Sequence, residues 1–218
     1  MNDSIKVLLA DDHTLLRRAV ARVLHESPAI TVVAEVGNAD DAITAALRFN
    51  PNVVVLDIDM PGVASFDAAR TITARVPSAR ILFLSAFTHD RYIEVALACG
   101  ALGYLSKNEP PEKVIDAIRA VAIGQCYFSP EVQSRLVIDA DGVHLGENSK
   151  SRAATLTNRE VEVLRYIARG MSKKEIAKTM HLSVKTIENH SASIMSRLDI
   201  HDRVELTRFA IREGLVEA

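Results

Sequence analysis

Residues 53–62 read VVVLDIDMPG, an apolar run that ends directly in an aspartate and leads into a proline–glycine pair. A continuous apolar run of this kind is typical of a strand that is buried on both faces of a parallel sheet. Similar runs recur along the chain at 6–10, 31–36, 81–84 and 103–105. Stretches with helical periodicity separate them, near 14–25, 38–49, 65–76, 90–99 and 111–123. Five strand–helix pairs predict a doubly wound α/β domain.

The pattern changes after residue 126. Residues 127–153 contain a short helical possibility, PEVQSRLV, and then DADGVHLGENSKSR, which has few apolar residues and many turn formers. We interpret this segment as a linker. It separates a first domain, residues 1–126, from a second domain, residues 154–218, whose apolar periodicity is helical throughout.

The second domain has clear helix starts. Thr157 with Glu160, and Ser172 with Glu175, have the spacing of capping boxes, and Ser183 is placed to cap a third helix. A fourth helix is expected from about residue 203 to residue 213. Together they predict a compact all-α four-helix domain, too small to be an obvious enzyme.

The composition excludes several classes of protein. The 218 residues include 26 basic and 28 acidic side chains, and 48% are apolar, which rules out a wholly disordered chain. No apolar run approaches the ~20 residues of a membrane span, and MNDSIKVLLADD lacks the pattern of a secretory signal. The two cysteines, Cys99 and Cys126, are too few for a disulfide framework. A reduced, cytoplasmic location is therefore expected.

The net charge of −2 combines an acidic first domain with a basic second domain. Residues 1–126 carry 12 basic and 15 acidic side chains, whereas residues 151–218 carry 12 basic and 9 acidic ones. A contact with a polyanion is therefore expected in the second domain.

Polar side chains follow the predicted strands of the first domain at the points where the strands end. Asp11 and Asp12 follow the first strand, Asp57 the third, Ser85 the fourth and Lys107 the fifth. Ligands of open parallel sheets bind beyond the carboxyl ends of the strands, so we expect these groups to converge. Three carboxylates suit Mg²⁺, whereas a lysine and a hydroxyl suit the oxygens of a phosphoryl group. Asp57 is then the nucleophile that takes the phosphoryl group covalently.

The segments LLADDH, VVVLDIDMPG, LFLSA and GYLSK, in this order, resemble the receiver domain of bacterial two-component response regulators over about residues 5–123. The resemblance implies a flavodoxin-like (βα)5 fold and phosphorylation of Asp57 by a sensor histidine kinase. It also implies that Asp11, Asp12 and Asp57 hold Mg²⁺ together with the backbone carbonyl of Asp59.

The same resemblance assigns three further side chains. Lys107 and Ser85 would bind the phosphoryl oxygens, and Tyr104 would turn inward when the Ser85 hydroxyl shifts. Packing alone is the alternative explanation for a tyrosine in a strand.

The segment DIDMP (57–61) also resembles the Asp-x-Asp motif of aspartyl-phosphate phosphatases, in which the second aspartate is a general acid. In that class the motif closes the first strand and continues with Thr or Val. Here it closes the third strand and continues with Met60 and Pro61. The pair Asp11 and Asp12 has no place in that mechanism, so a hydrolase is the disfavoured alternative and the chain is expected not to be an enzyme.

Residues 172–198 have a helix-turn-helix layout, in which the second helix lies in the major groove of DNA. With Ile187, Ile194 and Leu198 in the core, helical spacing turns the opposite side of this helix outward. Basic side chains on both helices are expected to contact phosphates, which give affinity without sequence information. The predicted DNA-binding residues are Lys173, Lys174, Ser183, Lys185, Thr186, Glu188, Asn189, Ser193 and Arg197.

The segments LTNREVEVL, GMSKKEIA, LSVKTIENH and RVELTRFAIREGL resemble the DNA-binding domain of the LuxR/FixJ class. Joined to a receiver, they make the chain similar to response regulators of the NarL/FixJ family over nearly its whole length. The resemblance implies a transcriptional regulator that phosphorylation switches and that binds double-stranded DNA as a homodimer. It further implies that Lys185, Thr186 and Asn189 touch DNA. The alternative is a regulator of the same architecture that a partner or its own concentration controls.

Glu188 departs from the family pattern, which often has Lys or Arg at this position. An acidic side chain near phosphates weakens binding unless it accepts a hydrogen bond from cytosine N4. Pairing with Lys185 or another basic residue of the domain, or a tolerated surface substitution, are the other interpretations.

Overall fold

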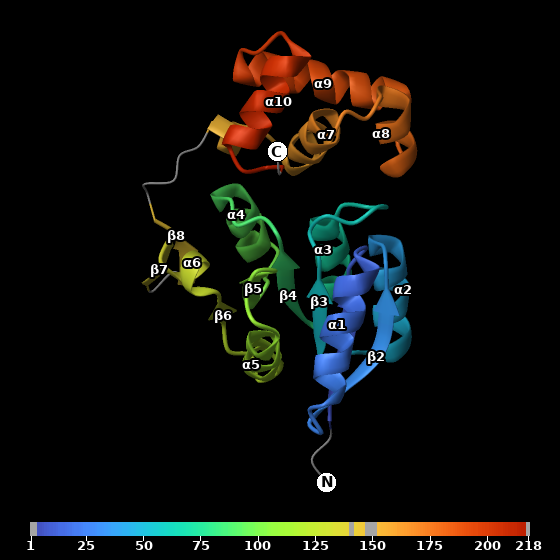
Figure 1. Ribbon diagram of the computed structural model, residues 1–218, viewed down its shortest axis with the longest axis vertical. Helices are drawn as coiled ribbons and strands as arrows, with labels where there is room; N and C mark the ends of the chain where they lie inside the picture. The colour runs from blue at the N-terminus through green and yellow to red at the C-terminus, as the bar shows by residue number, and fades with distance from the viewer. Residues whose placement is uncertain (1–3, 140–141, 147–151, 217–218) are drawn as a thin grey trace. The chain divides into compact units, whose positions relative to one another are not determined.

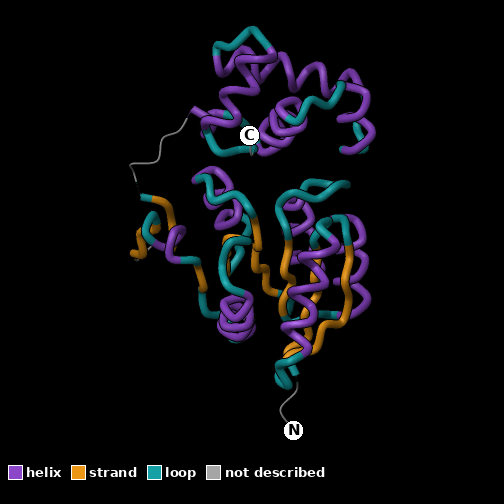
Figure 2. The backbone as a smooth tube through the Cα atoms, in the orientation of Figure 1, coloured by secondary structure: helices purple, strands orange, loops and turns teal. Residues whose placement is uncertain are grey.

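The computed structural model describes residues 4–139, 142–146 and 152–216. Its first part alternates strands and helices, which confirms the predicted α/β pattern (Figures 1 and 2). The elements are β1 (Ile5–Ala10), α1 (Thr14–His25), β2 (Ile30–Val36), α2 (Ala39–Phe49), β3 (Val53–Leu56), α3 (Ser65–Arg75), β4 (Arg80–Ser85), α4 (Asp90–Ala98), β5 (Gly103–Ser106) and α5 (Pro111–Ala122).

These strands and β6 (Tyr127–Phe128) form one parallel sheet in the order β2-β1-β3-β4-β5-β6. The chain passes from β1 to β2 on one side and returns to β3 on the other side of β1. This reversal leaves a crevice beyond the carboxyl ends of β1 and β3, where doubly wound sheets bind their ligands. Ala10 and Leu56, the last residues of these two strands, are partners in the register.

Helices cover both faces of the sheet because side chains alternate along each strand. On one face, Val7 and Leu9 of β1 form a buried cluster with residues of α1 and α5. On the other face, the ring of Phe83 in β4 lies 5.2 Å from that of Phe66 in α3. The central strands are therefore apolar on both faces, and polar side chains collect at the strand ends.

The segment that was predicted to be a linker contains regular structure. β6 (Tyr127–Phe128) pairs with β5 and adds a sixth strand, and α6 (Pro130–Gln133) takes up only the first half of the short helical possibility at residues 130–137. β7 (Leu136–Asp139) and β8 (Gly142–Leu145) form a separate two-stranded sheet where no strand was predicted. β6 has only two residues and β8 (GVHL) only two apolar ones, whereas the apolar residues of β7 (LVID) begin within the stretch PEVQSRLV, for which a helix was expected. The predicted linker also includes residues 140–141 and 147–151, which lie outside the described residues.

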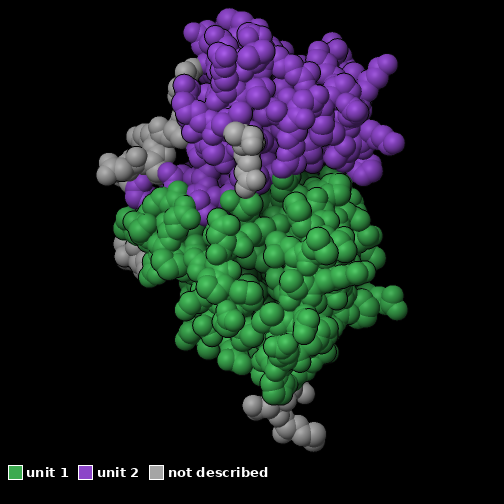
Figure 3. Space-filling model, viewed as in Figure 1, with its two compact units in different colours: residues 1–86, 96–144 green, residues 87–95, 145–218 purple. Residues whose placement is uncertain are grey.

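The chain forms two compact units, residues 1–86 with 96–144 and residues 87–95 with 145–218 (Figure 3). The second unit contains a 3₁₀ helix, η1 (Arg152–Thr155), and then α7 (Asn158–Ala168), α8 (Lys173–Thr179), α9 (Val184–Leu198) and α10 (Arg203–Arg212). This confirms the four predicted helices.

The predicted helix starts of the second unit are also confirmed. Thr157 and Glu160 form a complete capping box at α7, and Ser172 and Glu175 form another at α8. The Ser183 side chain accepts a hydrogen bond from the backbone N–H of Thr186 at the start of α9. Each cap satisfies backbone donors that have no partner within the helix. None of the helices in the described part of the chain is both long enough and apolar enough to cross a membrane.

The segment Phe87–Val95 belongs to the second unit. The guanidinium of Arg165 in α7 lies 4.6 Å from the ring centre of Phe87 and 5.5 Å from that of Tyr92. His89 Nε2 lies 3.6 Å from an oxygen of Glu213 at the end of α10. Both ring distances fall within the range of cation–π attraction.

Candidate functional site

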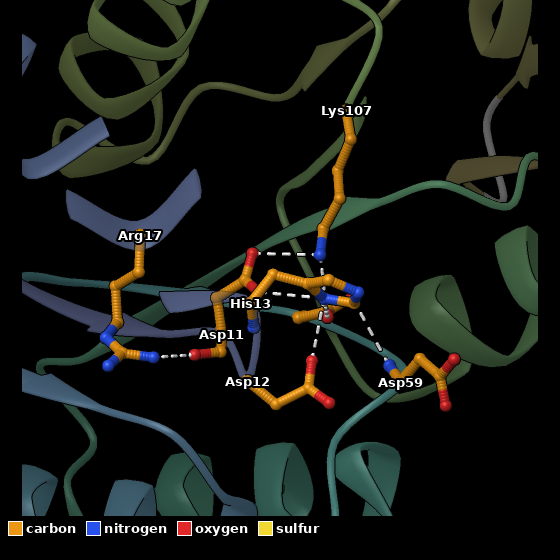
Figure 4. A network of polar contacts seen from close by, with 7 residues as sticks. Asp11, Asp12, His13, Arg17, Asp59 and Lys107 are labelled. Atoms are coloured by element: carbon orange, nitrogen blue, oxygen red, sulfur yellow. Dashed lines mark hydrogen bonds and ion pairs between the residues drawn. The ribbon is translucent and has the colours of Figure 1, made fainter. Parts of the chain in front are cut away.

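Acidic side chains gather beyond the carboxyl ends of β1 and β3 (Figure 4). The backbone N–H of Asp57 donates to the carbonyl of Ala10, which holds the two strand ends side by side. Ligand atoms of Asp11, Asp12, His13 and Asp57 all lie within 4.8 Å of one another. This Asp-rich group therefore offers several oxygen ligands of the kind that a hard divalent cation prefers.

Lys107 follows β5 and extends its ammonium group into this cluster. Its Nζ lies 2.7 Å from Asp57 Oδ2 and 2.8 Å from Asp11 Oδ2. The backbone N–H of Lys107 donates to the carbonyl of Ser85, so the ends of β4 and β5 are fixed together. The side chain of Asp57 is only 2% exposed, and those of Asp11 and Lys107 are nearly as buried. The predicted carboxylates and lysine are therefore brought together, with Asp11, Asp57 and Lys107 buried and Asp12 open to solvent.

Burial is the largest influence on the pKa values of Asp57, Asp12 and Lys107. It raises the pKa of Asp57 to about 6, although the nearby Lys107 ammonium lowers it. Burial and the neighbouring carboxylates of Asp59 and Asp11 also raise the pKa of Asp12, against the effect of His13. Burial would lower the pKa of Lys107, but the carboxylates of Asp57 and Asp11 raise it overall. Crowded carboxylates and a charged lysine make the site receptive to a cation and to phosphoryl oxygens.

His13 and Arg17 belong to this network but were not among the predicted site residues. His13 Nδ1 lies 2.8 Å from Asp12 Oδ1 and 4.0 Å from Asp57 Oδ2. Arg17 donates from Nη1 to the backbone carbonyl of Asp11. The only sequence signal for His13 is its place directly after the aspartate pair, and Arg17 carries no signal by itself.

Three more of the predicted site residues lie in or after neighbouring strands: Ser85 in β4, Tyr104 in β5 and Asp59 after β3. Ser85 is the last residue of β4 and is fully buried. Tyr104 in β5 is 1% exposed, and its ring lies 6.3 Å from that of Phe83. The backbone N–H of Asp59 donates to Asp57 Oδ1 over 3.3 Å. Tyr104 is therefore buried, as the packing explanation requires, whereas the switch explanation places it inward once the Ser85 hydroxyl has shifted.

Replacing Asp57 with asparagine is expected to stabilise the protein at pH 7 in the absence of Mg²⁺. The folded-state pKa of about 6 exceeds the ordinary value of 3.8, so the buried charge destabilises the fold at neutral pH. The free energy of unfolding should rise by about 1–3 kcal/mol, and the gain should disappear as the pH falls from 6 to 4 and the wild-type carboxylate takes up its proton.

Urea unfolding of both proteins between pH 4 and pH 7 measures this difference. Asp116→Asn is the matched control, since Asp116 is exposed and lies 4.0 Å from the equally exposed Lys113. The control should change stability little at any pH. A less stable Asp57→Asn protein at pH 7 contradicts the prediction.

The second unit presents basic and polar side chains on α8 and α9. Lys173 and Lys174, at the start of α8, are exposed, as are Lys185 and Asn189 on α9. Ile187, Ile194 and Leu198 are completely buried, which confirms the predicted inner face of α9. The Ser183 hydroxyl is engaged in capping α9 and lies 2.8 Å from Thr186 Oγ1.

Glu188 lies between two of the predicted phosphate-binding lysines. Its carboxylate oxygens are 3.6 Å from Lys173 Nζ and 3.7 Å from Lys185 Nζ. Pairing with Lys185 and with a second basic residue was one of the interpretations left open by the sequence. The acidic residue therefore reduces the positive charge of this face rather than standing alone on it.

Ser193 and Arg197 point toward their own domain. The Ser193 hydroxyl donates to a carboxylate oxygen of Glu160, and Arg197 Nε lies 3.5 Å from the same oxygen. Arg197 Nη1 also donates to the carbonyl of Thr155 over 2.7 Å. Both side chains thus stabilise the packing of α9 against α7 and η1 and are less available to DNA than the lysines.

Both parts of the chain match known families. Residues 7–119 match the family "Response regulator receiver domain", and residues 154–210 match "Bacterial regulatory proteins, luxR family". The chain is 34% identical to the response regulator UvrY of Escherichia coli strain K12 over 214 residues, which cover 98% of this chain and 97% of UvrY. It is 32% identical to the oxygen regulatory protein NreC of Staphylococcus epidermidis over 217 residues, 98% of this chain and 100% of NreC.

A solved structure shares the fold. RcsB from Salmonella enterica serovar Typhimurium, bound to a promoter in the presence of the phosphomimetic BeF₃⁻, aligns with a TM-score of 0.71. The alignment covers 95% of this chain and 98% of RcsB at 23% sequence identity. At this identity the similarity establishes the fold alone.

Proposed function

Because the chain belongs to the response regulators that join a receiver domain to a LuxR-type DNA-binding domain, we propose that phosphorylation of Asp57 switches its binding to DNA. Members of this family are two-component transcriptional regulators and not enzymes. Their receiver accepts a phosphoryl group from a sensor histidine kinase, and their C-terminal domain binds DNA. The observation that carries the assignment to Asp57 is its buried carboxylate, 2.7 Å from Lys107 Nζ.

In the proposed reaction, an oxygen of Asp57 attacks phosphorus in line with the bond to the donor. The new P–O bond forms as the bond to the donor breaks, and the leaving group departs with that electron pair. The Lys107 ammonium exchanges its contact with the Asp57 carboxylate for a contact with a phosphoryl oxygen. The Ser85 hydroxyl donates a hydrogen bond to a second phosphoryl oxygen. Asp11, Asp12, Asp57 and the Asp59 carbonyl would hold Mg²⁺, which neutralises the charge of the transferred group.

The proposed response to the phosphoryl group runs along the chain from Ser85. Phe87–Val95, which packs on Arg165 and Glu213 in the second unit, begins two residues after Ser85. A shift of Ser85 and Tyr104 would therefore reach this segment through the chain, and release of the DNA-binding domain is one way in which the switch could act. Dimerisation is the other way in which the same switch could act. The phosphoryl group drives either change only if it stabilises the active state of the protein more than the inactive state.

The experiment that tests this function combines phosphorylation with DNA binding. The full chain is incubated with Mg²⁺ and acetyl phosphate, and its solution size and its affinity for duplexes selected from a random pool are measured. Tighter binding with a monomer-to-dimer change supports dimerisation, and tighter binding without it supports release. Unchanged DNA affinity in a phosphorylated protein favours control by a partner or by concentration instead.

In the proposed DNA complex, α9 lies in the major groove. Lys185, Thr186 and Asn189, near its N-terminus, would meet base edges and phosphates. Lys173 and Lys174 at the start of α8 would contact the backbone. The exposure of the lysines and of Asn189 supports this assignment. Ser193 and Arg197 contact Glu160 of their own domain, so we expect them to contribute less to DNA binding.

Replacing Glu188 with glutamine is expected to tighten binding to a 30-base-pair duplex of random sequence. The change frees Lys173 and Lys185 from a carboxylate that lies within 4 Å of both. The slope of log affinity against log salt should become steeper by about 1, since one or more additional phosphates are neutralised. Fluorescence anisotropy at several salt concentrations measures both quantities.

Glu205→Gln is the control for this measurement. Glu205 is an exposed acidic residue on α10, so its replacement changes the net charge of the domain equally. The same gain in both variants would assign the effect to net charge. Weaker binding of Glu188→Gln to selected duplexes alone would indicate base recognition by Glu188.

A further inference from the structure

Arg17 of α1 reaches back to the loop that follows β1 (Figure 4). Its Nη1 donates to the backbone carbonyl of Asp11, and its Nε lies 3.9 Å from Glu35 Oε2 on β2. The side chain is 16% exposed. Arg17 therefore connects the loop carrying the aspartate pair to the edge strand of the sheet.

The contact fixes one particular peptide group. The N–H of Asp11 donates to the carbonyl of Val36 on β2, so that side of Asp11 is held by the sheet. The carbonyl of Asp11 belongs to the peptide that joins Asp11 to Asp12. The donation from Arg17 opposes rotation of this peptide, which sets the backbone angles ψ of Asp11 and φ of Asp12.

We propose that Arg17 is a positioning residue that orients Asp11 and Asp12 for the divalent cation without contacting the cation or the phosphoryl group. The inference rests on the proposed function, in which these carboxylates hold Mg²⁺. Groups that orient metal ligands from behind contribute strongly to metal affinity, and their loss costs about 10-fold or more.

The charge of Arg17 and its contact with the Asp11 carbonyl would change the Mg²⁺ affinity in opposite directions. A guanidinium close to a cation site repels the cation, so removal of its charge alone would tighten Mg²⁺ binding. Loss of positioning would weaken it. A purely structural role would lower thermal stability and leave the Mg²⁺ affinity of the folded protein unchanged. The sign of the change in affinity therefore separates the three roles.

The experiment is a calorimetric titration of Mg²⁺ into the full chain. Arg17→Met should weaken Mg²⁺ binding about 10-fold, and its rate of phosphorylation by acetyl phosphate should recover at saturating Mg²⁺. Arg18→Met, on the neighbouring exposed arginine of the same helix, is the control and should bind Mg²⁺ as wild type does. Arg17→Lys keeps the positive charge but cannot contact Glu35 and the Asp11 carbonyl together. Its Mg²⁺ affinity is therefore expected to lie between those of the wild type and Arg17→Met.

The outcomes are distinct. Equal or tighter Mg²⁺ binding by folded Arg17→Met overturns the positioning role while leaving the proposed function intact. No Mg²⁺ binding by the wild type overturns both. If Arg17→Met does not fold, Arg17→Lys decides the question, because wild-type Mg²⁺ affinity in that variant contradicts the inference.

Discussion

Replacing Asp57 with asparagine is expected to abolish uptake of a phosphoryl group from acetyl phosphate or a sensor kinase. The amide keeps the shape of the side chain but lacks the carboxylate that attacks phosphorus. The side chain of Asp57 is 2% exposed and its Oδ2 lies 2.7 Å from Lys107 Nζ, whereas Asp11, which lies 2.8 Å from the same Nζ, is proposed only as a ligand of Mg²⁺. Intact-mass measurement should show a gain of one phosphoryl group in the wild type and none in the variant.

The matched control for this prediction is Asp59→Asn. Asp59 lies two residues away and is proposed to contribute only its backbone carbonyl to the site. Its replacement should therefore leave phosphoryl uptake largely intact. A variant at position 57 that still gains the phosphoryl group would place the acceptor elsewhere, and a loss in the Asp59 variant alone would exchange the roles of the two aspartates.

Replacing Glu160 with alanine is expected to cause a large loss of stability in the DNA-binding domain. The carboxylate is part of a residue only 3% exposed; it accepts from the Thr157 N–H and from the Ser193 hydroxyl, and it lies beside Arg197. The substitution removes half of a capping box and leaves partly buried donors without an acceptor. The expected cost is about 2–4 kcal/mol in the free energy of unfolding.

Thermal unfolding followed by circular dichroism, together with DNA binding as a function of temperature, measures this loss. Glu175→Ala removes the same capping-box residue from the exposed start of α8, so it should cost clearly less. Equal losses in the two variants would show that capping alone matters and that the link from α7 to α9 contributes nothing.

Acid should reduce the contribution of Glu160. Burial would raise its pKa, but hydrogen bonds from Ser193 and Thr157 and the charge of Arg197 hold it below the ordinary value. A carboxyl with a lowered folded-state pKa contributes stability at neutral pH and loses that contribution as the pH falls through the folded-state pKa. The difference between wild type and Glu160→Ala should therefore narrow below about pH 4.

Several features of this protein follow from local sequence. The short apolar runs are long enough only for buried strands, and capping boxes such as Thr157 with Glu160 mark where helices begin. The convergence of Asp11, Asp57 and Lys107 was predictable because parallel strands bring their carboxyl ends to one edge. In these cases a local pattern and a general rule of topology suffice.

Other features required the tertiary structure. β6 depends on the neighbouring β5 for its hydrogen bonds, and its two residues carry no periodicity of their own. Helical spacing places Ser193 and Arg197 on a face of α9, but it does not reveal that α7 brings Glu160 against them. The donation from Arg17 to the Asp11 carbonyl is equally invisible, because main-chain acceptors have no sequence signature.

The sequence by itself therefore predicted the order of strands and helices from β1 to α5, the starts of α7, α8 and α9, and the acidic character of the sheet edge. These properties depend on apolar periodicity and on residues close together in the chain. Only the tertiary structure decided which side chains meet: Glu188 with Lys173 as well as Lys185, His13 with the carboxylates, and Arg17 with the loop that carries them. The physical reason is that hydrogen bonds and ion pairs act over a few ångströms, and distances of that size between elements are set by packing.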